Sequence, residues 1–169
     1  MTDFSDYRAH EKGSLRVYCD GGARGNPGQA AIAFIIKNQH NQTVHRHAET
    51  IGVTTNNVAE YKAVIAALEF LVKTTAAKHS QFITIFLDSQ LVARQLAGKF
   101  RIKTPHLLTL VRRVRQIEES LAVGLQTQTN RGGLFFSPSI AYEHIPRELN
   151  SEADELVNQA LDQSPSTRS

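Results

Sequence analysis

The chain is 169 residues long, and 41% of its residues are hydrophobic and 21% charged. These values fit one folded domain and exclude a mostly disordered chain, while the lone cysteine, Cys19, excludes an intramolecular disulfide or a zinc site of paired thiolates. Lysine and arginine number 19 against 16 aspartates and glutamates, and the resulting formal charge of +3 is compatible with nucleic acid without requiring it.

The ends of the chain and its apolar segments indicate one domain with short tails. Residues 1–14 are polar without periodicity and residues 163–169 are rich in serine, so we expect a flexible lead-in and tail around a domain at 15–162. No apolar stretch is long enough to cross a bilayer. The first residues do not have the pattern of a secretory signal, so we expect none. With its single cysteine, the sequence therefore predicts a cytoplasmic protein without a membrane partner.

The first third of the chain predicts three strands. Alternating apolar and polar residues over 15–20 predict the first strand, and a stretch with four glycines at 21–28 predicts a long turn after it. Residues 29–37 predict a buried strand, and residues 42–51 predict its partner across a polar turn. Short turns between consecutive strands imply an antiparallel meander.

The rest of the chain alternates helices with strands. Apolar spacing predicts helices over 55–74, 89–97, 105–121 and 150–161, and short β-branched or aromatic runs predict strands over 81–87 and 139–145. Residues 122–138 contain three glycines and predict irregular structure. Strands that alternate with helices pair in parallel through right-handed crossovers. The expected fold class is α/β: a mixed five-stranded sheet, antiparallel in its first three strands and parallel in its last two, with helices on both faces.

Four acids stand at the ends or starts of these expected elements. Asp20 ends the first strand, Glu60 lies early in the long helix, Asp88 ends the buried strand, and Asp154 lies in the closing helix. Each acid alone has an ordinary explanation. Asp88 before Ser89 can cap a helix, and Asp154 can lie on an exposed helix face.

Taken together, the four acids predict a metal site. Ligands in an open α/β sheet collect outside the carboxyl ends of parallel strands, where both Asp20 and Asp88 arrive. Converging carboxylates repel one another and require cations, and hard oxygen ligands select Mg²⁺ or Mn²⁺ over zinc. A pair of such ions can activate a water and stabilise the leaving oxygen at a phosphodiester.

Four segments around these acids resemble a known family. They read YCDGGARGNPG from Tyr18, TTNNVAE from Thr54, LDSQ from Leu87 and HIPRELNSEAD from His144. In this order, from about residue 15 to residue 161, the chain resembles the type 1 ribonuclease H family and its ribonuclease H-like fold. It looks most like the branch that lacks a basic handle insertion.

The resemblance implies an endonuclease that hydrolyses the RNA strand of RNA–DNA hybrids and depends on Mg²⁺ or Mn²⁺, two ions per active site. Asp20, Glu60, Asp88 and Asp154 match the family's catalytic, metal-binding carboxylates. By this resemblance Asp20 bridges both ions, Asp154 holds the ion that activates water, and Glu60 and Asp88 hold the other. We expect no small-molecule organic cofactor, and we expect a monomer.

Four polar residues match the family's substrate contacts. Asn26, Asn56 and Gln90 match contacts to the minor groove of the hybrid, and Thr55 with Asn56 resembles a pocket for a phosphate of the DNA strand. Amides both donate and accept, which suits recognition of a 2′-hydroxyl. Asn26 is also typical of a turn and Thr55 of a helix N-cap. Each residue can have this structural role and contact substrate as well.

The histidines have two interpretations. His144 stands ten residues before Asp154, the separation of the family's mobile histidine, and could carry a proton near the reacting oxygens. It could equally be a packed histidine at a strand end, and the sequence leaves this open. His45 and His47 share a face of a predicted strand, but without a third ligand we interpret them as surface residues rather than a metal site.

Positive charge is concentrated between residues 89 and 117, which contain no acid. The basic residues there are Arg94, Lys99, Arg101, Lys103, Arg112, Arg113 and Arg115. They predict phosphate contacts, with a solvated helix face as the alternative for 112–115. The short segment 98–103 replaces the handle helix of well-known bacterial members, and the lead-in is too short for a hybrid-binding domain. We therefore expect weak, salt-sensitive binding and low processivity.

Two other functions remain open at this point. One is a nucleic-acid-binding module that kept the fold but lost efficient catalysis, against which the intact set of four acids argues. The other is a different nuclease of the same superfamily, such as an exonuclease or a resolvase. Asn26, Asn56 and Gln90 favour recognition of ribose over that option.

Overall fold

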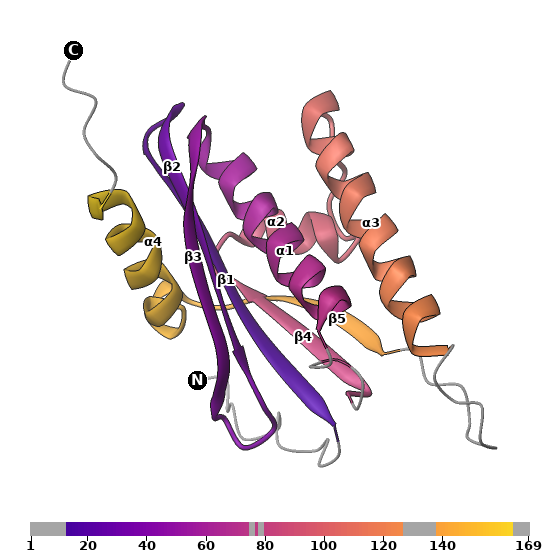
Figure 1. Ribbon diagram of the computed structural model, residues 1–169. Helices are drawn as coiled ribbons and strands as arrows, with labels where there is room; N and C mark the ends of the chain where they lie inside the picture. Colours follow the sequence, from indigo (N-terminus) through magenta and orange to yellow (C-terminus); the bar gives the residue numbers. More distant parts are fainter. Residues whose placement is uncertain (1–12, 75–76, 78–79, 127–137, 164–169) are drawn as a thin grey trace.

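The computed structural model describes residues 13–74, 77, 80–126 and 138–163, with side chains as far as residue 122 in the third helix. Its centre is a five-stranded sheet in the order β3-β2-β1-β4-β5 (Figure 1). The strands are β1 Ser14–Gly25, β2 Gly28–Lys37, β3 Thr43–Thr54, β4 Phe82–Leu87 and β5 Ser139–His144. β1, β2 and β3 pair antiparallel, whereas β4 is parallel to both β1 and β5. The expected α/β fold class and sheet are confirmed.

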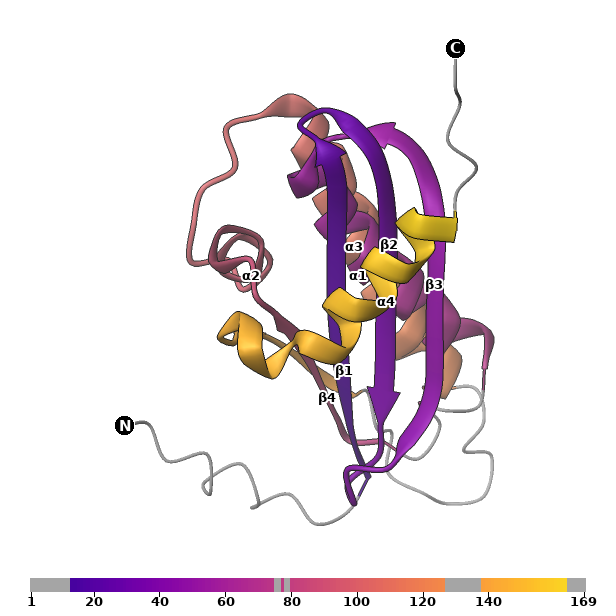
Figure 2. The same ribbon diagram turned by 90° about the vertical axis from the view of Figure 1, so that its left-hand side faces the viewer.

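Helices cover both faces of this sheet. They are α1 Asn56–Lys73, α2 Gln90–Leu96, α3 Pro105–Gln126 and α4 Ser151–Gln163, with a short 3-10 helix η2 at Arg147–Leu149. In Figure 2, α4 crosses the near face of β1, β2 and β3, and α1 and α3 lie behind the sheet. Among the described residues, no helix has the length and apolar character needed to span a membrane.

The apolar run of β2 is explained by this double cover. Ala30, Ile32, Phe34 and Ile36 belong to the main core, which is shared with α1 and α3. Ala31 and Ala33 face the other way and pack against Val157 and Leu161 of α4. A strand buried on both faces reads as a continuous apolar run rather than as an alternation.

The glycine-rich segment differs from the expectation. The sequence predicted a long turn over 21–28, but β1 continues to Gly25, β2 begins at Gly28, and the connection is Asn26-Pro27, with a cis peptide bond between the two. The glycines were interpreted as turn residues, but Gly21 pairs within the sheet with Ile32 of β2. A strand therefore occupies most of the segment in which a turn was expected.

Other elements also differ from the expectation. α3 runs five residues past its expected end at 121, so the start of the segment expected to be irregular is helical. The short helix η2 before α4 was not expected. The rest of that segment, 127–137, lies outside the described residues, as do 1–12 and 164–169 of the expected tails.

Candidate active site

Three of the four predicted acids converge at one edge of the sheet. Asp20 lies just beyond the last residue pair of the parallel β1–β4 ladder, Asp88 directly follows β4, and Glu60 lies in the second turn of α1. Each offers a carboxylate oxygen, and these oxygens lie within 4.8 Å of one another. Asp154, in the first turn of α4, lines the same cleft. Parallel strands end at a common edge, which is why residues far apart in sequence meet there.

The close approach of α1 to β1 brings Glu60 beside Asp20. A Cβ atom on Gly21 would lie 2.2 Å from the carbonyl carbon of Ala59 and 2.4 Å from the amide nitrogen of Glu60. Real side chains do not tolerate such distances, so only glycine permits this contact between strand and helix. Gly21 therefore helps to set the spacing of the two carboxylates.

Asn150 ties the start of α4 to the end of β1. Its buried side-chain amide donates to the carbonyl of Cys19, at 2.9 Å, and its backbone carbonyl accepts from the N–H groups of Ala153 and Asp154. These bonds link the residue before Asp20 to the helix turn that carries Asp154. Asn150 was not predicted as a site residue, although it stands one turn before Asp154.

Burial and mutual repulsion make the acids hard to ionise together. Burial first, and then the charges of Asp88 and Asp154, raise the pKa of Asp20 to about 7. Burial, the charges of Asp20 and Asp88, and a hydrogen bond with Asp88 raise the pKa of Glu60. Glu60 Oε2 is buried and has no hydrogen-bond partner among the described residues. Positive charge bound beside these carboxylates would relieve their repulsion and favour their ionised form.

Arg147 and Asn158 hold the carboxylate of Asp154. The Arg147 guanidinium donates to Asp154 Oδ1, and the Asn158 amide donates to Oδ2 at 3.1 Å. Arg147 also lines the cleft and lowers the pKa values of Asp20 and Glu60. Neither role was predicted from the sequence; the spacing of four between Asp154 and Asn158 was the available signal for a contact on one helix face.

Asn26, Thr55 and Asn56 meet where the β1–β2 hairpin touches the start of α1. Asn56 lines the cleft, and its Oδ1 accepts from the backbone N–H of Ala23 at 2.8 Å. Asn26 Oδ1 accepts from the backbone N–H of Asn56 at 3.1 Å. Thr55 caps α1 by accepting from the N–H of Val58. Asn26 therefore belongs to the β1–β2 connection and Thr55 is the N-cap of α1, as the alternative interpretations predicted.

Gln90 and His144 lie beside the cleft rather than in its walls. His144 ends β5 opposite Leu87, the residue before Asp88, and its side chain is exposed. Gln90 is the exposed first residue of α2. Neither lines the cleft that holds the acids. Gln90 follows Asp88 by two residues, and His144 lies on the neighbouring strand opposite Leu87, so both are near the end of β4.

Two of the seven basic residues have acidic partners within the described part of the chain. Arg113 pairs with Glu69 of α1 at 2.6 Å, and Arg115 pairs with Glu118 at 2.9 Å and also donates to the carbonyl of Leu96. The Arg113–Glu69 pair joins α3 to α1 and the bond from Arg115 to Leu96 joins α3 to α2, whereas the Arg115–Glu118 pair lies within α3. The sequence segment that contains the arginines has no acid, but folding brings acids to them from outside it.

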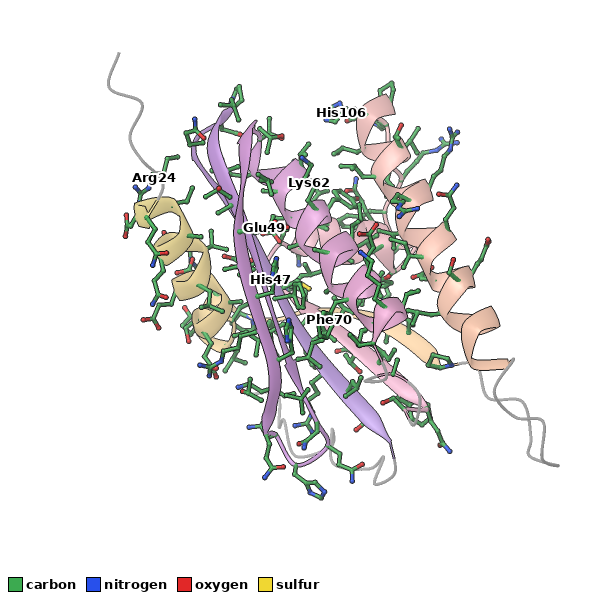
Figure 3. All side chains as sticks on the ribbon, in the orientation of Figure 1. Arg24, His47, Glu49, Lys62, Phe70 and His106 are labelled. Atoms are coloured by element: carbon green, nitrogen blue, oxygen red, sulfur yellow. The ribbon has the colours of Figure 1, made fainter. Side chains whose placement is uncertain are left out.

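His45 and His47 lie on β3, where one contacts an aromatic ring and the other an acid. The ring of His45 stacks on the ring of Phe70 with a centroid distance of 3.8 Å. His47 Nε2 lies 3.5 Å from Glu49 Oε1, and Figure 3 labels both residues. Within the described part of the chain, Asp20, Glu60 and Asp88 form the one group of three or more metal-ligating side chains that converge this closely.

Comparison with known proteins gives a consistent match along the chain. The family profile described as RNase H matches residues 12–162. Ribonuclease HI of Halobacterium salinarum is 40% identical over 152 residues, which cover 89% of this chain and 65% of that protein. A bifunctional protein of Mycobacterium tuberculosis, Rv2228c, is 36% identical over 147 residues, and the chain spans 35% of its length.

A solved structure gives the same match in three dimensions. The crystal structure of LC11-RNase H1, isolated from compost by a metagenomic approach, holds an RNA/DNA hybrid. It superimposes with a TM-score of 0.74 at 36% sequence identity, over 90% of this chain and 99% of that one.

Proposed function

Because the chain belongs to the type 1 ribonuclease H family, we propose that it is an endonuclease that cleaves the RNA strand of RNA–DNA hybrids with two divalent cations. The observation that carries the proposal is the convergence of Asp20, Glu60 and Asp88 within 4.8 Å, with Asp154 in the same cleft. The RNA/DNA hybrid held by LC11-RNase H1 supports the choice of substrate.

The donor set fits Mg²⁺ or Mn²⁺. All four groups are carboxylates, the hard oxygen ligands that these ions prefer. The raised pKa values of Asp20 and Glu60 are expected where cations complete a site, and so is the buried Oε2 of Glu60, which has no hydrogen-bond partner among the described residues. When bound, such a pair of ions activates water and stabilises the leaving oxygen. Asp20, Glu60, Asp88 and Asp154 would hold the ions.

The other residues position the cation ligands and the substrate. Arg147 and Asn158 orient the carboxylate of Asp154, which keeps it aimed at the cleft in the absence of metal. Thr55 and Asn56 lie where a phosphate of the DNA strand would meet the N-terminus of α1. Asn26, Asn56 and Gln90 would contact the sugars, whose 2′-hydroxyls distinguish RNA from DNA. All these groups come from one chain, so a monomer suffices.

A substrate panel tests this proposal. The protein is incubated with end-labelled RNA–DNA hybrid, double-stranded RNA, double-stranded DNA and single strands, each with Mg²⁺, Mn²⁺ or a chelator. We expect internal cuts in the RNA strand of the hybrid only when a divalent ion is present. Binding without metal-dependent cuts would identify a binding module instead, and cleavage of the DNA strand or only from strand ends would identify a different nuclease.

A further inference from the structure

The cleft extends well beyond the acids. It has a volume of about 520 Å³ and follows β1 away from Asp20 along one face of α4. Residues Asp154, Val157, Asn158 and Leu161, spaced as one face of a helix, form the wall. Arg24 stands at the end of the groove farthest along β1 from Asp20.

The floor of this groove is nearly free of side chains. It consists of Gly21, Gly22 and Ala23. A Cβ atom on Gly22 would lie 3.2 Å from Val157 Cγ1, so the wall helix packs closely over the strand. Because the floor residues carry no side chain larger than a methyl group, a nucleic-acid backbone that lies in the groove beside Val157 would approach the protein main chain between the acids and Arg24.

Arg24 is placed to supply the positive charge that the groove otherwise lacks at this end. Its side chain is 54% exposed and forms an ion pair with Asp162 of α4, which is 66% exposed. Figure 3 shows Arg24 beside the C-terminal end of α4. An exposed ion pair of this kind contributes little to stability. A guanidinium, by contrast, binds phosphate through two parallel charge-assisted hydrogen bonds.

We propose that Arg24 binds a backbone phosphate of the strand that is cut, on one side of the cleavage site, and that Asp162 holds the guanidinium over the groove until substrate arrives. This inference rests on the proposed function. Arg24 stands four positions after Asp20 on an extended strand, a length of about 13 Å. One strand of a duplex has a phosphate for about every 3.4 Å of axis, so the contact lies at most about four nucleotides from the cut.

A second arginine offers a matched control. Arg46 of β3 pairs with Glu152 of α4, and the side chains are 57% and 50% exposed, much like those of Arg24 and Asp162. Arg46 lines a different hollow, against Ile35 and Leu156, rather than the cleft of the acids. Neutralising Arg46 removes the same charge and the same kind of ion pair without touching the groove.

Binding to hybrid separates the two arginines. Arg24→Gln, Arg24→Lys and Arg46→Gln are each combined with Asp20→Asn, so that bound hybrid stays whole, and affinity is measured over a range of salt. We expect Arg24→Gln to weaken binding several-fold and to lower the slope of log K against log salt by about 0.7 to 0.9. Arg24→Lys keeps most of the affinity, and Arg46→Gln leaves slope and affinity unchanged. Equal effects of Arg24→Gln and Arg46→Gln would overturn the proposal.

Neutral methylphosphonate linkages then locate the contact. One linkage at a time is placed within four nucleotides on either side of the cut, in the RNA strand or in the DNA strand. The loss caused by Arg24→Gln disappears for one RNA-strand position. Its persistence at every RNA position, or its disappearance only for a DNA position, would contradict the proposal. Failure of wild type to cut hybrid would instead refute the proposed function, so the two failures are distinguishable.

Discussion

Asp20 links the chemistry of the site to the stability of the fold. Its pKa rises from 3.8 to about 7 on folding, mainly because of burial. The folded protein therefore holds this proton more tightly than the unfolded chain does. Between about pH 4 and pH 7 the stability associated with Asp20 falls as pH rises. A cation bound by the carboxylate would reverse that loss.

Because the raised pKa of Asp20 lowers stability at high pH, removing this carboxylate should stabilise the metal-free protein. Asp20→Asn removes the buried charge, so at about pH 8 its free energy of unfolding should exceed that of wild type by an amount on the order of a few kcal/mol, with a higher melting temperature. The difference should shrink towards about pH 4, where the wild-type carboxyl is protonated. Thermal denaturation with chelator at both pH values measures it, and a pH-independent difference would contradict the account.

His144 allows a second test at this scale. It lies beside Asp88 without lining the cleft, so we expect it to move a proton rather than to bind substrate or metal. His144→Ala should slow cleavage and change the pH–rate profile while leaving hybrid affinity as it was. His106→Ala, an exposed histidine at the start of α3, serves as control. An unchanged rate and profile would remove His144 from the chemistry.

Some residues of the candidate site could be found from the sequence and others could not. Asp20, Glu60, Asp88 and Asp154 stand out as acids beside apolar segments, where burial needs a reason. Arg147 does not stand out, because its contact with Asp154 depends on the unexpected helix η2 between the last strand and α4. Its place in the site follows from tertiary structure rather than from local pattern.

At the scale of elements, the glycines of β1 explain why the sequence predicted a turn where the structure has a strand. Clustered glycines usually mark turns. In this chain Gly21 instead permits helix α1 to approach the strand, and the sequence alone carries no sign of which use applies. The β-strand pairing of Gly21 with Ile32 then extends the hairpin to Gly25. Strands and helices were otherwise predictable because their apolar periodicity is set by burial against the sheet.

The packing of β1 against α1 predicts unequal effects at neighbouring glycines. Gly21→Ala would place its Cβ atom 2.2 Å from backbone of α1, whereas Gly22→Ala would place one 3.2 Å from a side-chain methyl of Val157. We expect Gly21→Ala to destabilise the fold by about 3 kcal/mol or more and Gly22→Ala by about 1 kcal/mol. Urea denaturation measures both, and equal losses would contradict this packing.

The basic residues of the α2–α3 connection should contribute more to hybrid binding than a basic residue of α3 that is already paired. Lys99, Arg101 and Lys103 are exposed on it and form no ion pair among the described residues, whereas Arg113 is paired with Glu69. Replacing the three loop residues with glutamine should weaken hybrid binding and reduce its salt dependence by up to about 0.9 for each phosphate that the variant no longer binds. Arg113→Gln should leave both unchanged. Equal reductions of affinity in the two variants would show that the loop has no special role.

At the scale of the whole molecule, the net charge of +3 conceals two separate regions. Four of the 16 acids lie in the cleft, so the other 12 are outnumbered by the 19 lysines and arginines of the chain. An acidic pocket in a basic surface attracts a polyanion once cations occupy the pocket. Because this attraction is electrostatic, we expect hybrid affinity to be weak at ~0.3 M salt.

The central claim is that the clustered carboxylates make this chain a nuclease for the RNA strand of hybrids. The most direct measurement compares cleavage rates of wild type, Asp20→Asn and Glu119→Gln, the last being an exposed acid of α3 outside the cleft. With Mg²⁺ and an end-labelled hybrid, Asp20→Asn should be slower by at least about a hundredfold, with circular dichroism unchanged. Glu119→Gln should match wild type. Near-normal cleavage by purified Asp20→Asn would contradict the account.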